Sequence, residues 1–473
     1  MKGRIIVFSV IGCPFCIRTK SYLEQLGLSY IDVNLDKNCA ARQLVIERTG
    51  KKTVPQIFFN EIYIGSWGDL NKLEKAELDR LIKLVQENEA PESAPKPPVA
   101  VEDDKTSNPF DFRCELDEYG ELVNELRDSG IVKEHKKNLK TYKNSFIGKE
   151  AVDWLSINKN LEREAAISMC QQLVERHFGH SVKKESAFKD DNSIYRFIED
   201  DEGKALNAGI HTQCEPRPAS DLGEELRQLI LSIYNSHLSS DGKKIDYKAI
   251  EENPKFKAYV QHTGKLHRVN VEGATRKEKL AFFINIYNAL VIHAFVTIGP
   301  PVNLWQRYKF FNTVSYVIGG YNYSLNDIEN GVLRSNRKPI GSLKKPFSKS
   351  DPRLKISLAE PEPKIHFALV CGAKSCPPIK TYSAKDVDNQ LKLAAESFLE
   401  GDGCIVDMKK KEVCVSQILK WYKEDFGSNK HQIVQFVHDN MGACEKKTQL
   451  AELLKSNNFK LNHIPYDWGI NSK

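Results

Sequence analysis

A proline-rich, acidic segment near residue 100 prevents this 473-residue chain from folding around one continuous core. The segment, NEAPESAPKPPVAVEDDKTSNP at 88–109, holds five prolines and almost no large apolar side chain. Such a composition cannot bury enough apolar surface to offset the entropy that is lost on ordering. We therefore expect a disordered linker at 89–109 between separately folded parts.

A second polar stretch divides the rest of the chain. The sequence EDDEGKALNAGIHTQCEPRPASD at 199–221 separates two regions with regular apolar patterns, and we expect a linker at 201–219. A domain usually takes roughly 100–200 residues, so the length also suggests about three domains. The expected domains are 1–88, 110–200 and 220–473.

Composition indicates the cellular compartment and the classes of partner that are expected. Eleven cysteines spread over 473 residues are unlike the dense framework of a small secreted domain. We therefore expect a reducing compartment, the cytoplasm, in which any disulfide is catalytic or transient. The net charge of +6 is small for this length, so we expect no nucleic-acid binding. The longest apolar stretch, 279–299, is interrupted by Asn285, Asn288 and His293, which favours a buried helix over a membrane span.

The first ninety residues predict a small α/β layer domain. Strands are expected at 5–9 and 30–34, with helices after Cys13 and around 40–49. Two further strands are expected within TVPQIFFNEIYIG, followed by a closing helix from 69 to about 87. In this order the CPFC motif lies where a strand ends and a helix begins.

The spacing of Cys13 and Cys16 favours a thiol redox pair. Cys13 would lie at a helix N-terminus, where unpaired backbone N–H groups favour a thiolate, and Cys16 one turn later can attack a mixed disulfide on Cys13. A zinc site needs about four ligands, and Cys39 alone does not complete one. Two structural cysteines would not explain the proline between them. We predict no metal and no bound cofactor.

The motifs CPFC, TVPQIFF and IGSWGDL, in this order over residues 1–87, resemble those of a dithiol glutaredoxin. The resemblance implies a thioredoxin-like fold, a nucleophilic Cys13, a resolving Cys16, a cis Pro55 and glutathione as co-substrate. It also implies the following glutathione-binding residues: Thr53, Val54, Pro55, Gly68 and Asp69. Val10 stands where many members carry a lysine. Gly12 stands where a thioredoxin would carry the tryptophan of its Trp-Cys-Gly-Pro-Cys motif.

Residues 110–200 predict three helices and a β-hairpin, which is a winged-helix arrangement of the α+β class. The stretches YKNSFIGKEAVDWL, LVERHFGH and FKDDNSIYRF resemble a DEP domain, the module shared with Dishevelled and pleckstrin. The resemblance implies membrane or receptor targeting and no enzymatic site. Six lysines within 17 positions allow two interpretations, a solvated charged face or contact with an anionic membrane. They are Lys133, Lys136, Lys137, Lys140, Lys143 and Lys149.

The third segment predicts a mixed α+β domain. A central helix is expected at FFINIYNALVIHAF, with Asn285 and Asn288 on one face. KIHFALVCGAKSCPPI predicts a buried strand at 365–370 that runs into a turn with Cys371 and Cys376. Together with YSLNDIENGVLR and YDWGIN, these stretches resemble the domain-of-unknown-function family 547 over about 220–473. That resemblance names a domain without naming an activity.

Three side chains suggest a second site in this domain. A thiol hydrolase uses a cysteine nucleophile, a histidine base and an orienting amide, for which the candidates are Cys376, His366 and Asn285. One alternative is a core histidine with two buried cysteines. Another is zinc held by His366, Cys371 and Cys376, for which no fourth ligand is evident.

These features predict a glutathione-dependent thiol-disulfide oxidoreductase, joined to a DEP targeting module and a third domain of unknown activity, in signalling or redox regulation. The expected partners are glutathione, glutathionylated or disulfide-bonded proteins, and an anionic membrane or receptor reached through the DEP domain. The protein is expected in the cytoplasm or peripherally at membranes. The alternatives are a redox-sensing scaffold without turnover and a C-terminal cysteine hydrolase.

Overall fold

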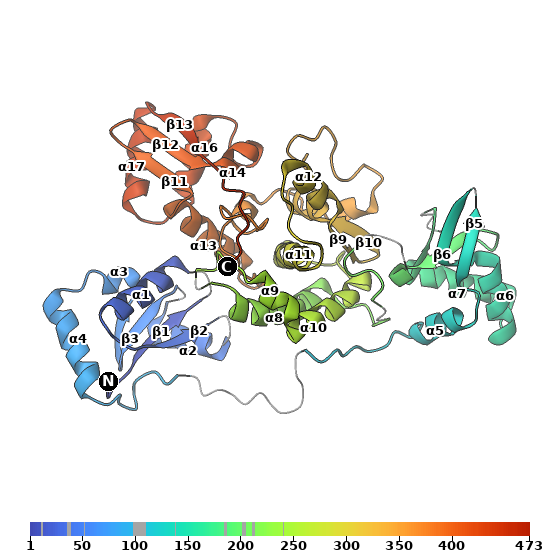
Figure 1. The fold of residues 1–473 in the computed structure, drawn as a ribbon, viewed down its shortest axis with the longest axis horizontal. Coiled ribbons are helices and arrows are strands. Elements are labelled where there is room, and N and C mark those ends of the chain that lie inside the picture. Colours follow the sequence, from blue (N-terminus) through green and yellow to red (C-terminus); the bar gives the residue numbers. More distant parts are fainter. Residues whose placement is uncertain are drawn as a thin grey trace.

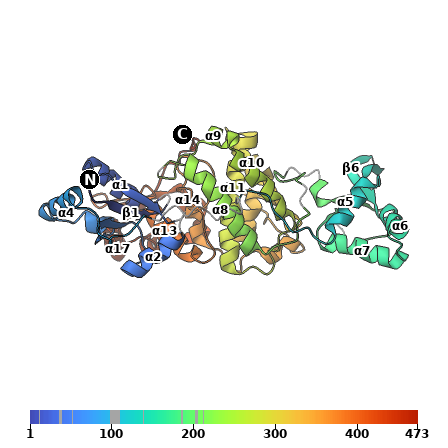
Figure 2. The ribbon, with the colours of Figure 1, turned by 90° about the horizontal axis from the view of Figure 1, so that it is seen from below.

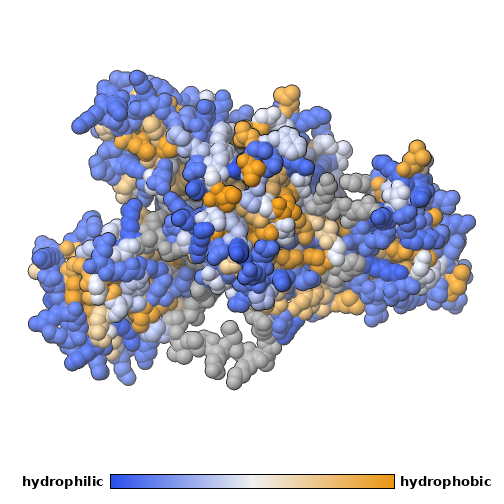
Figure 3. Space-filling view, viewed as in Figure 1, coloured by the Kyte–Doolittle hydropathy of each residue, from blue (hydrophilic) through white to orange (hydrophobic). Residues whose placement is uncertain are grey.

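Three domains lie in a row, with the third domain of the sequence in the middle (Figures 1 and 2). The computed structural model describes residues 1–10, 13–35, 39–51, 53–97, 110–137, 139–183, 187–200, 205–210, 213–239 and 241–473. The first domain lies at one end of the row and the second at the other. In the view of Figure 3 the two end domains are mainly hydrophilic, and apolar patches lie over the central part.

The first domain is a four-stranded sheet with helices on both faces, which is the thioredoxin-like arrangement. The strand order is β2-β1-β3-β4, with β2 parallel and β3 antiparallel to β1. Successive residues of β1 alternate between two apolar clusters, as the two-residue period of a strand requires. The elements are β1 (Ile5–Ser9), α1 (Pro14–Gln25), β2 (Ile31–Asn34), α2 (Cys39–Thr49), β3 (Gln56–Phe59), β4 (Ile62–Gly65), α3 (Trp67–Leu70) and α4 (Lys75–Glu87).

The closing helix predicted at 69–87 is in fact two helices. The short α3 ends at Leu70, and α4 begins at Lys75. Leu70 of α3 and Leu78 of α4 belong to the same apolar cluster.

The second domain has the predicted winged-helix content. A four-stranded sheet of order β5-β6-β8-β7 packs with the three helices around one apolar core. The predicted hairpin is β5–β6, and SIYRF forms the central strand β8. The elements are α5 (Gly120–Asp128), β5 (Lys133–Lys137), β6 (Lys140–Ile147), α6 (Gly148–Asn158), α7 (Arg163–Glu175), β7 (Gly179–Ser181), β8 (Ile194–Phe197) and η1 (Ile198–Asp200).

The third domain has two lobes with separate apolar cores. The larger lobe is mainly helical and surrounds α11. Its elements are α8 (Ala219–His237), α9 (Tyr247–Glu252), α10 (Pro254–His262), η2 (Thr263–Arg268), α11 (Arg276–Ile298), α12 (Leu304–Thr313), β9 (Ser315–Ile318), β10 (Tyr321–Ser324), η3 (Asp327–Leu333), η4 (Pro352–Ile356) and η5 (Pro363–Phe367).

The smaller lobe is a three-stranded sheet, β11-β12-β13, covered by helices. Its elements are α13 (Val387–Glu400), β11 (Cys404–Asp407), β12 (Glu412–Ser416), α14 (Gln417–Trp421), α15 (Lys423–Phe426), α16 (Lys430–Asp439), α17 (Glu445–Ser456) and β13 (Lys460–Ile464). Both lobes contribute side chains to the cavities described below.

The apolar helix α11 is the centre of the larger lobe. Within the described part of the chain it is the one helix long and apolar enough to cross a membrane, but 83% of its most apolar window is buried inside the structure. The core helix of a globular domain has the same property, and the predicted buried helix is confirmed.

The buried strand predicted at 365–370 is wrong. Residues 363–367 form the short 3-10 helix η5, in which Pro363 occupies the first turn and the Glu362 carboxylate accepts a hydrogen bond from the Lys364 N–H. A short apolar run fits a buried helical turn as well as a strand, and here the proline and its capping residue decide between them.

The predicted linkers are partly packed chain. Residues 89–97, predicted as the start of a disordered linker, lie against the first domain, where Ala94 is buried and its carbonyl accepts from Arg4. The prediction for 98–109 concerns residues outside the described ones, as does that for 201–204 and 211–212. In the described part of 201–219, Asn207 is fully buried and bonds the backbone of Thr263 and Val317 in the third domain.

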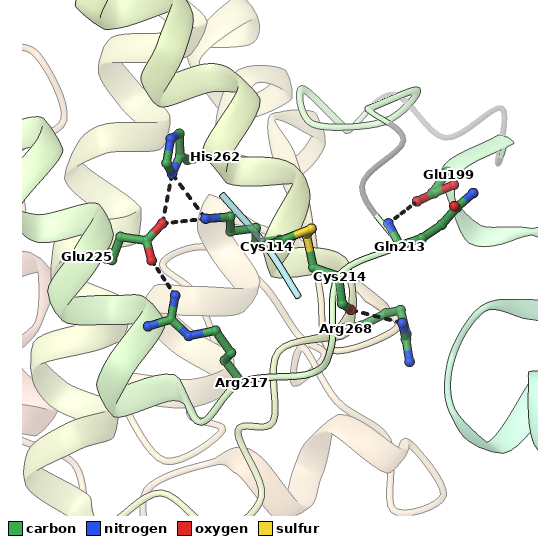
Figure 4. Close-up of a disulfide and its surroundings, with 9 residues drawn as sticks. Cys114, Glu199, Gln213, Cys214, Arg217, Glu225, His262 and Arg268 are labelled. Carbon is green, nitrogen blue, oxygen red and sulfur yellow. Dashed lines mark hydrogen bonds and ion pairs between the residues drawn. A yellow bond between two sulfur atoms is a disulfide. The ribbon is translucent and has the colours of Figure 1, made fainter. Parts of the chain in front are cut away.

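A disulfide between Cys114 and Cys214 joins the chain that enters the second domain to the chain that leaves it. Arg268 of η2 donates to the Cys214 carbonyl at 3.0 Å (Figure 4). It also forms a buried ion pair with Asp117 at 2.6 Å. Only a catalytic or transient disulfide was expected, and this one lies outside the CPFC motif. Its cysteines are 100 positions apart, and sequence spacing offered no signal for it.

Candidate active site

The Cys13 sulfur lies at the N-terminus of α1. It accepts a hydrogen bond from the Cys16 backbone N–H at 3.2 Å and so caps the helix. Both cysteines are buried, with 6% and 1% of their surfaces exposed. The structure therefore places the two predicted catalytic residues one helical turn apart, as their spacing requires.

The surroundings give the two thiols opposite tendencies to ionise. The hydrogen bond from the Cys16 side chain holds the pKa of the Cys13 thiol below its ordinary value despite burial, helped by the Cys16 N–H and the positive charge of Lys380. Burial, together with the hydrogen bond to Cys13, raises the pKa of the Cys16 thiol well above its ordinary value. Of the two thiols, Cys13 is therefore the one that ionises more readily.

The predicted turn at 53–55 lies directly beside Cys13. The Val54–Pro55 bond is cis, and the Val54 carbonyl oxygen is 3.9 Å from the Cys13 sulfur. Gln56, a buried residue that sequence reasoning missed, fixes this turn by donating to the Thr53 carbonyl at 3.0 Å. A polar side chain at the start of an apolar strand was the available signal for it.

The predicted residues Gly68 and Asp69 lie in α3. The Asp69 carboxylate accepts from the Ser66 N–H at 2.7 Å and from its hydroxyl at 2.8 Å, which closes a capping box at the start of the helix. The Ser66 N–H holds the pKa of Asp69 below its usual value. This helix packs on α1 through Trp67 and Tyr22, whose ring centres are 5.7 Å apart.

A segment of the third domain lies over the same face of the first domain. Val10 and Val54 share a hollow of about 70 Å³ with Ile379, Lys380 and Thr381. Figures 1 and 2 show α1 on the side of the first domain that faces the third. Lys380 thus brings a positive charge to Cys13 at a site where the first domain itself contributes the apolar Val10. No sequence pattern pointed to Lys380.

The proposed histidine base in the third domain has a different partner from the one predicted. The His366 Nε2 lies 2.7 Å from an Asp425 oxygen, and Arg334 contacts the same carboxylate at 2.6 Å. The ring stacks on Tyr422 at 3.9 Å between centres. Burial lowers the pKa of His366, while Asp425 opposes that change.

Cys376 and Asn285 lie in other surroundings. The Cys376 sulfur contacts the Cys371 sulfur and the Tyr466 hydroxyl. The Asn285 side-chain amide donates to the Tyr382 carbonyl and accepts from the Tyr382 N–H. Within residues 241–473, all of which are described, no hydrogen bond joins His366 to either residue. Across the described part of the chain, no group of three His, Cys, Asp or Glu side chains is arranged to hold a metal ion.

His366 does line a cavity of about 530 Å³ between the two lobes. Cys371 and Glu329 also line it, with aromatic residues from both lobes. Glu329 lies in the π-helix η3 and accepts hydrogen bonds from the hydroxyls of Tyr287 and Tyr422. The aromatic walls and the few buried polar groups are typical of a small-molecule site.

Comparison with known proteins identifies the first domain. The glutaredoxin family model matches residues 5–64. Glutaredoxin 3 of Escherichia coli K12 is 42% identical over 82 residues, which are 17% of this chain and 99% of that protein. A glutaredoxin of Pseudomonas aeruginosa is 33% identical over 79 residues, covering 16% of this chain and 94% of that protein. The chain belongs to the glutaredoxin family.

Two solved glutaredoxin structures are similar to part of this chain. A buckwheat glutaredoxin–glutathione complex is 29% identical, covers 18% of this chain and 76% of its own, and has a TM-score of 0.16. A wheat glutaredoxin is 33% identical over 18% of this chain and 80% of its own, with a TM-score of 0.17.

Two further family models match in the predicted order. The domain found in Dishevelled, Egl-10 and Pleckstrin (DEP) matches residues 131–197, and the protein of unknown function family DUF547 matches residues 271–399. The glutaredoxin relatives support a thiol oxidoreductase activity for the first domain. The DEP and DUF547 matches add domains whose activity they do not specify.

Proposed function

We propose that this protein is a glutathione-dependent thiol-disulfide oxidoreductase whose DEP and DUF547 domains determine where it acts and on what. The observation that carries the proposal is the opposed ionisation of the two motif thiols at the start of α1, beside the cis Val54–Pro55 bond. A low-pKa thiolate next to a protonated partner thiol is the arrangement that disulfide exchange requires.

In the proposed reaction, the Cys13 thiolate attacks the glutathione sulfur of a protein–glutathione disulfide. The protein sulfur leaves as a thiolate and takes a proton, and glutathione remains on Cys13. A second glutathione thiolate then attacks the glutathione on Cys13, which regenerates the Cys13 thiolate and releases glutathione disulfide. For a protein disulfide, Cys16 instead attacks the mixed disulfide on Cys13 and releases the reduced protein. Thr53, Val54, Pro55, Gly68 and Asp69 are the proposed glutathione contacts.

The cellular setting is part of the same proposal. The enzyme works in the cytoplasm on glutathionylated or disulfide-bonded proteins, and its DEP domain brings it to an anionic membrane or a receptor. A redox-sensing scaffold without turnover is the competing function, because burial of both motif thiols and the cover provided by the third domain also suit a sensor.

The first prediction separates these functions by turnover of the mixed disulfide of glutathione and 2-mercaptoethanol in the presence of glutathione. The full chain should turn over steadily. Cys13→Ser should lose the activity to background because the attacking sulfur is gone. Cys16→Ser should keep it and lose the reduction of protein disulfides.

Cys414→Ser is the matched control, because Cys414 is a free, half-buried cysteine in the smaller lobe of the third domain. It should leave both activities unchanged. Absence of turnover in the wild-type chain would favour the scaffold. Full activity in Cys13→Ser would contradict the assignment of the nucleophile.

A further inference from the structure

The DUF547 domain carries a second pair of close cysteines. The sulfurs of Cys371 and Cys376 lie 3.3 Å apart as free thiols, and the Tyr466 hydroxyl lies 3.6 Å and 3.4 Å from them. A disulfide bond is about 2.05 Å long, so closing the pair requires the sulfurs to approach by little more than ~1 Å. The pair can therefore change between dithiol and disulfide with a small local movement.

The two thiols differ in the same way as the motif pair. Burial opposes ionisation of Cys376, but hydrogen bonds from Cys371 and Tyr466 outweigh it and bring the pKa of the Cys376 thiol to about 7. The hydrogen bond to Cys376 and burial raise the pKa of Cys371 well above its ordinary value. A low-pKa sulfur attacks as a thiolate and is also a good leaving group in disulfide exchange. Cys376 is therefore suited both to forming a disulfide and to being released from one.

Cys376 faces the glutaredoxin domain. It lines a cleft of about 410 Å³ together with Phe15 and Arg18 of α1 and Tyr466. Phe15 stands between the two motif cysteines in the sequence, so the cleft reaches the helix turn that carries them. The opposite member of the pair, Cys371, lines the separate cavity that contains His366.

The segment that follows Cys376 lies near Cys13 of the glutaredoxin domain. Lys380, four residues later, shares a hollow with Val54 and lowers the pKa of Cys13. Four residues of extended chain span at most about 14 Å, so the backbone of Cys376 lies within that distance of the backbone of Lys380. Of the described residues of α1, Phe15 and Arg18 line the cleft, and its capping residue Cys13 does not. Contact between the sulfurs of Cys13 and Cys376 therefore requires the first domain to rotate relative to the third, about the contact at Lys380.

We propose that the Cys371–Cys376 pair is an internal substrate of the Cys13–Cys16 pair, which reduces it when it is oxidised to a disulfide. The proposal rests on the glutaredoxin activity proposed above and names a substrate for that site. Attachment in one chain supplies a high effective concentration without a large binding surface. The ratio of reduced to oxidised glutathione thereby determines whether the Cys371–Cys376 pair is a dithiol or a disulfide.

The Cys371–Cys376 disulfide is reduced in three stages. The Cys13 thiolate attacks the Cys376 sulfur, the Cys371–Cys376 bond breaks, and the Cys371 sulfur leaves as a thiolate that takes a proton from water. Cys16, after losing its proton to water, attacks Cys13 and releases Cys376 as a thiolate. Two electrons have then passed to the third domain, and Cys13 and Cys16 form a disulfide. Two glutathione molecules reduce that disulfide and leave as glutathione disulfide.

The test follows the thiol state of the full chain by differential alkylation and peptide mass spectrometry. Glutathione disulfide oxidises the protein, the excess is removed, and reduced glutathione is added. In the wild-type chain, the Cys371–Cys376 disulfide should form and then disappear with a rate constant that does not change on dilution of the protein. Cys13→Ser should slow its disappearance at least tenfold, and Cys414→Ser should not. Cys16→Ser should trap a peptide cross-linked through Cys13 and Cys376.

Three results would overturn the proposal. The first is that no Cys371–Cys376 disulfide forms, the second is an equal rate of reduction in Cys13→Ser, and the third is the absence of a Cys13–Cys376 cross-link in Cys16→Ser. The same preparations are assayed with the small glutathione mixed disulfide. Turnover there together with any of these results rejects the internal substrate alone, whereas absence of turnover rejects the proposed glutaredoxin activity itself.

Discussion

At the scale of single residues, the unusual contribution to the active site is a charge from another domain. Lys380 belongs to the third domain and lowers the pKa of Cys13, whereas Val10 of the first domain, which lines the same hollow, is apolar. A positive charge stabilises a thiolate and lowers the pKa of its thiol. The docked arrangement of the two domains thus contributes to the reactivity of the nucleophile.

The second prediction tests this charge with Lys380→Gln. Removal of the charge raises the pKa of the Cys13 thiol, so less thiolate is present at neutral pH and the rate–pH curve moves to higher pH. A partly screened charge is worth up to about 1 kcal/mol, which corresponds to a roughly two- to fivefold slower alkylation of Cys13 by iodoacetamide at neutral pH. Alkylation rates at several pH values, followed by peptide mass spectrometry, measure the shift.

Lys385→Gln is the control, because this lysine lies in the same segment and acts on Glu224 instead. It should leave the curve for Cys13 in place. Restoring a charge from within the first domain, with Val10→Lys added to Lys380→Gln, should recover the original curve. An unchanged curve in Lys380→Gln would show that the third domain has no electrostatic effect on the nucleophile.

The sequence predicted the residues whose role depends on local spacing. Cys13 and Cys16 are three residues apart on one helix, and Pro55 starts a strand next to them, so a pattern within the first domain is enough to identify them. Lys380 lies more than three hundred positions away, and only the docked domains bring it to the site. Asp425, the partner of His366, is likewise 59 residues distant and belongs to the other lobe.

At the scale of elements, the β5–β6 hairpin of the DEP domain carries most of the lysine cluster. Lys136, Lys140 and Lys143 are exposed along it, and Leu139 is fully exposed at its end. Lys133 instead pairs with Glu150 at 3.2 Å. An apolar tip among basic residues suits contact with an anionic lipid surface.

The third prediction concerns this hairpin. Lys136→Glu combined with Lys140→Glu should weaken binding to vesicles that contain phosphatidylserine at least about thirtyfold, since each lysine near such a surface is worth about 1 kcal/mol. Binding of the wild-type chain should also fall as salt is raised, because exposed charges are screened within about 8–10 Å at physiological ionic strength. Vesicle sedimentation measures both effects.

The matched control reverses two exposed lysines on the third domain, Lys248→Glu with Lys257→Glu, which changes the net charge equally. Equal loss of binding in both double variants would mean that overall charge, not the hairpin, attracts the vesicles. Binding that ignores salt and both substitutions would leave a receptor protein as the partner of the DEP domain.

The elements that the sequence predicted correctly have clear apolar runs, as in β1, β3 and the buried helix α11. The failures are short segments, namely η5 and the break between α3 and α4. In η5 a proline and its capping residue decide the conformation, and periodicity over a few residues cannot show it.

At the scale of the whole molecule, the DEP and DUF547 domains share a buried interface, here called the junction. Arg268 is buried there, with its guanidinium 3.5 Å from the centre of the Phe178 ring, and it bonds Asp117 and the carbonyls of Arg176 and Cys214. The Cys114–Cys214 disulfide closes the same junction. Neither feature has a signature in the sequence, because both depend on residues that are at least 54 positions apart.

The fourth prediction tests this junction with Arg268→Ala. The substitution removes the closer of two arginine partners of the buried Asp117 carboxylate and leaves Arg176 at 3.7 Å. Loss of a buried charge partner costs up to about 3–5 kcal/mol. Hydrogen exchange of the full chain should therefore accelerate in α5 and η2, and the DEP domain should become sensitive to protease.

Arg80→Ala is the control, because it removes an exposed ion pair with Glu77 on α4, and exposed pairs contribute little to stability. It should change neither measurement appreciably. Similar exchange in the two variants would show that the junction does not depend on the buried ion pair.

The lysine that acts on Cys13 has a consequence for the use of the first domain as a separate protein reagent. A fragment that ends before the third domain keeps the CPFC motif but loses the charge of Lys380, because that charge belongs to another domain. Such a fragment would react more slowly than its motif suggests.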